Sequence, residues 1–142
     1  MKIRKMEKGD LEKGFLESLK NLSTVGDLPI EEWHIICDEI LQNPVYTIFV
    51  AEEEEGKIVG TATFLLERKF IHKGGFVGHI ENVAVQKENQ GQGIGGKLVA
   101  HAISYAKEKD CYKVILDCSD HNVPFYEKFG FKKAEICMRL DL

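Results

Sequence analysis

Gln90-Gly91-Gln92-Gly93-Ile94-Gly95-Gly96 is the stretch of this sequence that decides the fold. It follows His79-Ile80-Glu81-Asn82-Val83-Ala84-Val85, a run typical of a β-strand, and it precedes residues 97–109, where apolar residues recur at helical spacing. A glycine-rich turn that opens a helix exposes backbone N–H groups without intrahelical partners, at the positive end of the helix dipole. Because such turns bind phosphate, the sequence predicts a site for a phosphorylated cofactor here.

Two other interpretations of the glycine turn are weaker. Gly91, Gly93 and Gly96 match the G-x-G-x-x-G fingerprint of dinucleotide-binding folds, and Asp117 follows about 20 residues later, as an acidic strand end would. However, five polar residues (86–90) separate the strand from the first glycine, and about 45 residues after the turn are too few to complete a doubly wound sheet. An ordinary helix start would not need so many glycines, since each one in a helix costs about 1 kcal/mol.

The spacing Gln90-x-x-Gly93-x-Gly95 instead resembles the pyrophosphate loop of the GCN5-related N-acetyltransferases (GNAT), which bind acetyl-CoA. Further features of that family follow in the same order, namely a strand at 114–117 and then Asn122, Tyr126 and Gly130-Phe131. The chain is most similar to one branch of the family, the glucosamine 6-phosphate N-acetyltransferases. The resemblance covers nearly the whole chain and rests on segments 22–26, 67–72, 111–118 and 122–131.

This resemblance implies one domain over residues 1–142 with the GNAT fold, a central mixed twisted sheet flanked by helices, of the α/β or α+β class. It also implies transfer of acetyl from acetyl-CoA to the 2-amine of D-glucosamine 6-phosphate, by direct attack, in UDP-N-acetylglucosamine biosynthesis. The implied catalytic residues are Glu81, which would receive or relay the amine proton, Asp117, which would orient the amine, and Tyr126, which would stabilise the thiolate leaving group.

The resemblance implies that backbone groups hold most of the acetyl-CoA. The strand before the turn would pair with the pantetheine amides, and a backbone N–H near Asn82 or Val83 would stabilise the oxyanion. The implied cofactor contacts are Asn82, Val83, Ala84, Val85, Gln90, Gly91, Gln92, Gly93, Ile94, Gly95, Gly96, Asn122, Phe125, Tyr126 and Lys128.

The acceptor phosphate requires cations, and the implied substrate contacts are Ser23, Lys69, Phe70, Ile71, His72, His79, Glu81, Asp117, Cys118 and Arg139. Two positions depart from the branch: Asn82 stands where relatives have Asp, and Asp141 stands where they have Arg. Either the last strand is shifted so that Arg139 binds the phosphate, or the loop at 69–72 holds it. Two alternatives therefore stay open: an acetyltransferase for another small amine or a peptide amine, and a non-catalytic acetyl-CoA sensor.

The bulk properties are those of a soluble globular protein, with 44% hydrophobic and 30% charged residues. A net charge of −4 argues against a nucleic-acid partner. The sequence contains no apolar run near the ~20 residues of a membrane span, no signal peptide and no paired cysteine spacing, so we expect a cytoplasmic protein. Five scattered histidines predict no metal site. Because the resembled relatives are homodimers, we expect a homodimer.

Outside the motif region, hydrophobic periodicity predicts the remaining elements. It indicates an irregular basic loop at 67–78 and an acidic turn at 52–56. The predicted strands and helices are a strand at 3–6, helices at 9–22 and 31–42, a hairpin of 45–51 with 58–66, and a last strand at 133–140.

Overall fold

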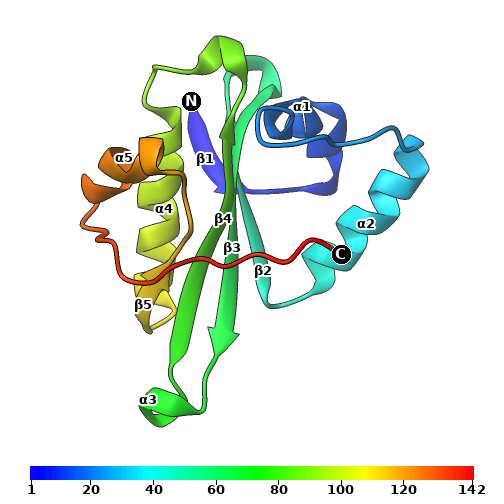
Figure 1. The fold of residues 1–142 in the computed structure, drawn as a ribbon. Helices are drawn as coiled ribbons and strands as arrows, with labels where there is room; N and C mark the ends of the chain where they lie inside the picture. Colours follow the sequence, from blue (N-terminus) through cyan, green and yellow to red (C-terminus); the bar gives the residue numbers. More distant parts are fainter.

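The computed structural model describes residues 1–142 as three layers, with a five-stranded sheet between two groups of helices (Figure 1). The first four strands are antiparallel neighbours, and the fifth runs parallel to the fourth. The predicted fold class, a mixed sheet flanked by helices, is confirmed. In spatial order the strands are β1 (Lys2–Lys5), β2 (Tyr46–Glu52), β3 (Ile58–Arg68), β4 (Phe76–Val85) and β5 (Cys111–Ile115).

Helices cover both faces of the sheet (Figure 1). One face carries α1 (Phe15–Leu19) and α2 (Ile30–Gln42), and the other carries α4 (Ile94–Glu108) and α5 (Val123–Glu127). The short α3 (Ile71–Gly74) lies at the far tip of the β3–β4 hairpin. Four short 3-10 turns complete the chain, η1 (Lys8–Glu12), η2 (Glu54–Gly56), η3 (Lys87–Asn89) and η4 (Asp120–Asn122). None of the helices combines the length and the apolar character that a membrane crossing requires.

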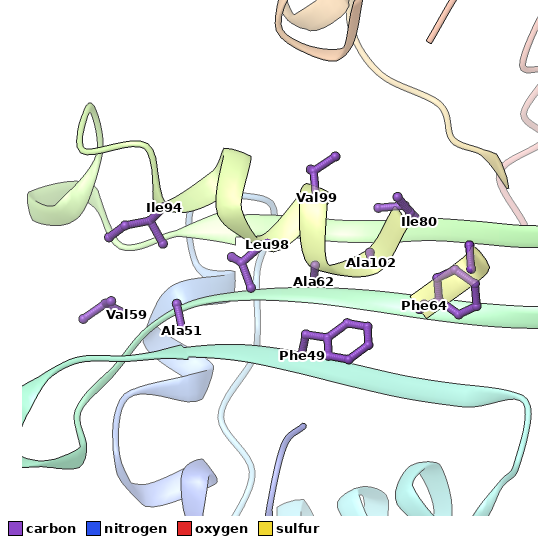
Figure 2. Close-up of a cluster of buried hydrophobic side chains, with 11 residues drawn as sticks. Phe49, Ala51, Val59, Ala62, Phe64, Ile80, Ile94, Leu98, Val99 and Ala102 are labelled. Atoms are coloured by element: carbon purple, nitrogen blue, oxygen red, sulfur yellow. The ribbon is translucent and has the colours of Figure 1, made fainter. Parts of the chain in front are cut away.

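The larger buried core lies between α4 and the sheet (Figure 2). Leu98, Val99 and Ala102 are fully buried on the inward face of α4, as expected from their helical spacing. Phe49 and Phe64 from the sheet meet the ring of Tyr105 edge-on, at centroid distances of 5.4 and 5.1 Å. This core fixes α4, and with it the glycine turn, against the centre of the sheet.

A second, smaller core lies between α1, α2 and the opposite face, and a buried ion pair adjoins it. Asp10 is fully buried and accepts two hydrogen bonds of 2.8 Å from the guanidinium of Arg4 and one of 2.8 Å from the backbone N–H of Glu7. Burial alone would raise the pKa of Asp10, but these hydrogen bonds lower it below its ordinary value. The N-terminal segment is therefore held to the sheet through a charged carboxylate.

Three predicted elements differ from the structure. The helix predicted at 9–22 is divided at Gly14, whose φ of +107° brings the chain so close to β3 that a Cβ would lie 2.6 Å from the carbonyl oxygen of Ile58. The basic loop predicted at 67–78 is shorter, because β3 continues to Arg68 and β4 begins at Phe76. The strand predicted at 133–140 is wrong for the single chain, because this exposed segment has no neighbouring strand to complete its hydrogen bonds.

Candidate active site

The two parallel strands, β4 and the edge strand β5, separate halfway along β4, and this split positions the site. Their pairing begins with Phe76 opposite Cys111 and ends with His79 opposite Ile115. Because β4 continues to Val85, one edge of its second half has no strand partner. Unpaired backbone groups at a sheet edge can pair with an extended ligand.

A β-bulge lies in β4 beside the split. Asn82 and Val83 together stand opposite the single β3 residue Ala62. Asn82 has a φ of +50°, a left-handed conformation that asparagine tolerates better than most residues. Bulges re-aim side chains and backbone groups and often occur next to active sites. The predicted oxyanion position, near Asn82 or Val83, lies at this bulge.

The glycine turn follows β4 and presents an open anion site. Gly91 and Gly93 both have a φ of +78°, and a Cβ placed on either would meet no atom within 4 Å. Gly93 is the N-cap of α4, and no side chain caps the first N–H groups of that helix. The turn thus offers free backbone donors at a helix N-terminus, the geometry that suits a phosphate group.

The three predicted catalytic residues come together at the split. Burial first, and the charge of Asp117 second, raise the pKa of Glu81 above its ordinary value. Burial also raises the pKa of Tyr126, with smaller contributions from Cys118 and Asp117. A carboxylate with a raised pKa and a phenol that keeps its proton, both near the same Asp117, are typical of a site that moves protons.

His79 and Lys69 meet through a residue that the sequence did not single out, Glu67. The Nε2 atom of His79 lies 2.9 Å from Oε1 of Glu67, and the Nζ atom of Lys69 lies 3.1 Å from Oε2. Glu67 belongs to β3 and His79 to β4, so the contact depends on the register of the hairpin. Glu67 could have been identified only from the pairing register of β3 and β4, and that register cannot be read from the sequence.

Four other predicted substrate contacts lie apart from this group. Phe70 and Ile71 are exposed at the tip of the β3–β4 hairpin. His72 stacks on Tyr112 at the start of β5, with ring centroids 4.0 Å apart. Ser23 is exposed in the loop between α1 and α2. The structure of one chain therefore does not gather the whole predicted acceptor site.

Arg139 also lies away from the other predicted contacts. It is exposed in the C-terminal segment, and its Nε atom pairs with Oδ1 of Asp141 at 3.1 Å. Asp141, which stands where relatives have Arg, thus contacts the arginine two residues before it. Within a single chain the Arg139 guanidinium pairs with a carboxylate, and its contact with a phosphate stays a prediction.

The remaining predicted cofactor contacts surround the split and the turn. Asn122 is the N-cap of α5 without a side-chain hydrogen bond, and Lys128 is its C-cap. The carbonyl oxygen of Val85 accepts hydrogen bonds from the side chains of Asn21 at 2.8 Å and Gln90 at 3.3 Å, a role of Asn21 that the sequence did not indicate. Around them lie Val83, Ala84, Gly91, Gln92, Gly93, Ile94, Gly95, Gly96 and Phe125.

Residues 13–131 match the acetyltransferase (GNAT) family. The chain belongs to this family. Among GNAT relatives, glucosamine 6-phosphate N-acetyltransferase from Candida albicans is 41% identical over 137 residues, which cover 96% of this chain and 92% of the relative. The enzyme of the same name from Arabidopsis thaliana is 42% identical over 139 residues, covering 96% and 93%. Its crystal structure superimposes with a TM-score of 0.94 at 41% identity, covering 99% of this chain and 97% of that one.

The predicted resemblance to GNAT acetyltransferases is thereby confirmed. GNAT acetyltransferases use acetyl-CoA, and two features described above fit that co-substrate: the unpaired edge of β4 and the open glycine turn. The first suits an extended chain carrying amide groups, and the second suits a pyrophosphate.

Proposed function

We propose that this GNAT protein transfers the acetyl group of acetyl-CoA to the 2-amine of D-glucosamine 6-phosphate, giving N-acetyl-D-glucosamine 6-phosphate and CoA in UDP-N-acetylglucosamine biosynthesis. The meeting of Glu81, Asp117 and Tyr126 at the β4–β5 split carries the proposal. The choice of acceptor is supported by relatives of that activity that match nearly the full chain.

Acetyl-CoA binds along the split in this proposal. The pantetheine arm lies against the free edge of β4 at Val83 and Val85, and the pyrophosphate accepts hydrogen bonds from the N–H groups of 91–96. Asn122 and Phe125 contact the cofactor from the side of α5. The thioester then ends beside the bulge, where a backbone N–H near Asn82 stabilises the oxyanion.

The acetyl transfer is a direct displacement. The amine nitrogen forms a bond to the carbonyl carbon, the carbon–sulfur bond breaks, and the sulfur leaves with the electron pair. Asp117 orients the amine, and Glu81 accepts its proton, a role favoured by a raised pKa. Tyr126 donates a hydrogen bond to the departing sulfur, and because its own pKa is raised it keeps its proton. The proton lost by the amine finally reaches the CoA thiol through the site and solvent.

The acceptor site combines cations of the β3–β4 hairpin with polar groups from the hairpin, from the segment after β5 and from the loop between α1 and α2. Lys69 and His72 are proposed to bind the phosphate, while His79, Cys118 and Ser23 contact the sugar. Lys69 already lies beside His79 through their shared contact with Glu67. The hairpin therefore supplies positive charge without Arg139.

A homodimer would complete this site. Four large apolar side chains, Phe70, Ile136, Met138 and Leu140, are at least 82% exposed in the single chain, and three of them follow one another at alternate positions of the C-terminal segment. That alternation is typical of a strand with one buried face. We infer that this segment pairs with a second copy of the chain, which would bring Arg139 to the partner's site.

The proposed setting is the cytoplasm, without a nucleic-acid or membrane partner. All four cysteines, Cys37, Cys111, Cys118 and Cys137, are free, which suits a reducing compartment. The net charge of −4 gives no attraction to the phosphate backbone of nucleic acids.

The deciding experiment is thiol release from acetyl-CoA by the purified protein with glucosamine 6-phosphate, glucosamine or spermidine as acceptor. Turnover confined to the phosphorylated sugar is expected. Preference for an amine without phosphate would support acetyltransferase activity but show that glucosamine 6-phosphate is not the substrate. Acetyl-CoA binding without turnover of any acceptor would instead favour a sensor.

A further inference from the structure

Glu67 joins two basic side chains that the proposed acceptor site takes from different elements. Its Oε1 atom lies 2.9 Å from Nε2 of His79, and its Oε2 atom lies 3.1 Å from Nζ of Lys69. Neither basic side chain has another ion-pair or side-chain hydrogen-bond partner. The position of both groups therefore depends on this one carboxylate.

The hairpin register explains why the three side chains meet. Glu67 stands directly opposite Val77, so it is the diagonal neighbour of His79 on the same face of the β3–β4 hairpin. Lys69 follows Glu67 by two residues, just beyond the end of β3, and turns its ammonium back to the carboxylate. Glu81 lies two residues beyond His79 on the same strand. Burial and Asp117 raise the pKa of Glu81, and a charge on His79 acts in the opposite direction. This cluster is thus continuous with the proposed catalytic group.

The carboxylate determines which ring nitrogen of His79 carries hydrogen. Hydrogen bonds from His79 and then Lys69 lower the pKa of Glu67, so its carboxyl group is ionised at neutral pH. An ionised carboxylate only accepts hydrogen bonds, and Nε2 of His79 must therefore be the protonated nitrogen. In a neutral imidazole this leaves a lone pair on Nδ1, which has no hydrogen-bond partner within the protein.

We propose that Glu67 is a positioning residue of the acceptor site, which fixes the His79 tautomer so that Nδ1 accepts a hydrogen bond from the aminosugar and which holds the Lys69 ammonium ready for the phosphate. The proposal rests on the proposed function. In this proposal Glu67 does not bind the phosphate, because its charge repels a phosphate and each of its oxygens already faces one basic side chain. It acts through the two side chains that it orders.

Nitrogen-15 NMR of the His79 ring tests the proposal without any turnover. In alkaline buffer the wild type is expected to carry its ring hydrogen on Nε2. Glu67→Gln retains a carbonyl oxygen as acceptor and keeps that tautomer, whereas Glu67→Ala gives a mixture of the two tautomers. An unchanged tautomer in Glu67→Ala overturns the proposal.

Steady-state kinetics supply the second measurement. Glu67→Ala is expected to raise the KM for glucosamine 6-phosphate about tenfold, the effect of losing one ordered polar contact, and to leave the KM for acetyl-CoA unchanged. The matched control is Glu17→Ala, which removes an equal charge from an exposed ion pair with Lys20 and should change neither KM. Equal sugar KM values in Glu67→Ala and the wild type overturn the positioning role. If the wild type is inactive on every aminosugar phosphate, the proposed function is wrong. The His79 tautomer in Glu67→Ala then still shows whether Glu67 positions that ring.

Discussion

Glu81 and Asp117 face each other across the open end of the sheet, closely enough that the charge of one raises the pKa of the other. Glu81 comes from β4, and Asp117 follows the end of β5. Burial makes the larger contribution to the shift in Glu81, and the neighbouring carboxylate adds to it. Burial and the neighbouring Asp117 thus make the carboxylate of Glu81 a stronger base than an ordinary glutamate.

The first prediction concerns that coupling. Asp117→Asn should lower the pKa of Glu81 toward its ordinary value of 4.5, since one of the two effects that raise it is removed. Carbon-13 NMR titration of the Glu81 carboxyl in both proteins measures the shift. In the wild type, kcat/KM should fall as the pH drops through the raised pKa, because Glu81 must be ionised to accept a proton. An identical titration in both proteins would contradict the coupling.

Tyr126→Phe should lower kcat by roughly 100- to 1,000-fold, the usual effect of losing a hydrogen bond to developing charge. The KM for acetyl-CoA should change little, because the phenol acts on the departing sulfur and not on the bound thioester. Tyr46→Phe is the matched control, since Tyr46 is exposed at the start of β2. A kcat equal to that of the control would exclude this role.

Two glycines of the turn should respond differently to the same added methyl group. Gly93→Ala should lower the free energy of unfolding by about 1–2 kcal/mol, because its φ of +78° disfavours a side chain. Gly95→Ala should be neutral or stabilising, since Gly95 is helical and its new Cβ would lie 3.7 Å from Phe125 Cζ, an ordinary contact. Urea denaturation of both variants measures the difference, and equal stabilities would show that the left-handed conformation is not required.

Asp10→Asn should lower the free energy of unfolding at pH 7 by about 3–5 kcal/mol, the usual result of breaking a buried ion pair. Because folding lowers the pKa of Asp10, its contribution is complete above the unfolded value of about 3.9 and is lost as the pH falls through the folded value. The stability difference between wild type and variant should therefore shrink in acid. Asp38→Asn, which breaks the exposed pair with Lys8, should cost at most about 1 kcal/mol.

Deleting residues 133–142 should convert the proposed dimer into a monomer that retains the fold of the sheet. These residues are exposed and form no strand within the chain, so their removal takes nothing from either core. Sedimentation equilibrium measures the mass, and circular dichroism checks the fold. Glu135→Ala keeps the full segment and should leave the dimer intact; a truncated protein that stays dimeric would place the interface elsewhere.

The sequence predicted best those features that depend on neighbours along the chain. The apolar stripe of α4 and the glycine turn before it are local patterns, and both are present where expected. The division of the first predicted helix at Gly14 could not be anticipated, because it results from close approach to Ile58, a distant residue. The contact of Glu67 with His79 likewise follows from the pairing of two strands.

The strand predicted at 133–140 shows a second limit of prediction from the sequence. The alternation of Ile136, Met138 and Leu140 is a local pattern typical of a strand, yet the segment forms no strand in this chain, because a strand needs a neighbour for its hydrogen bonds. The segment pairs with none of the five strands of this chain. In the proposed dimer a second copy of the chain would supply that neighbour and so determine the position of Arg139.

In the proposed binding mode, the split between β4 and β5 also links the stability of this protein to the supply of its co-substrate. The free edge of β4 exists only in the folded state, so a thioester bound there protects the native chain and not the unfolded one. At a ligand concentration 100 times its Kd, this protection amounts to about 2.7 kcal/mol. A cell well supplied with acetyl-CoA would thus keep more of the protein folded and out of reach of proteases. Starvation would then reduce both the rate of acetylation and the amount of the catalyst.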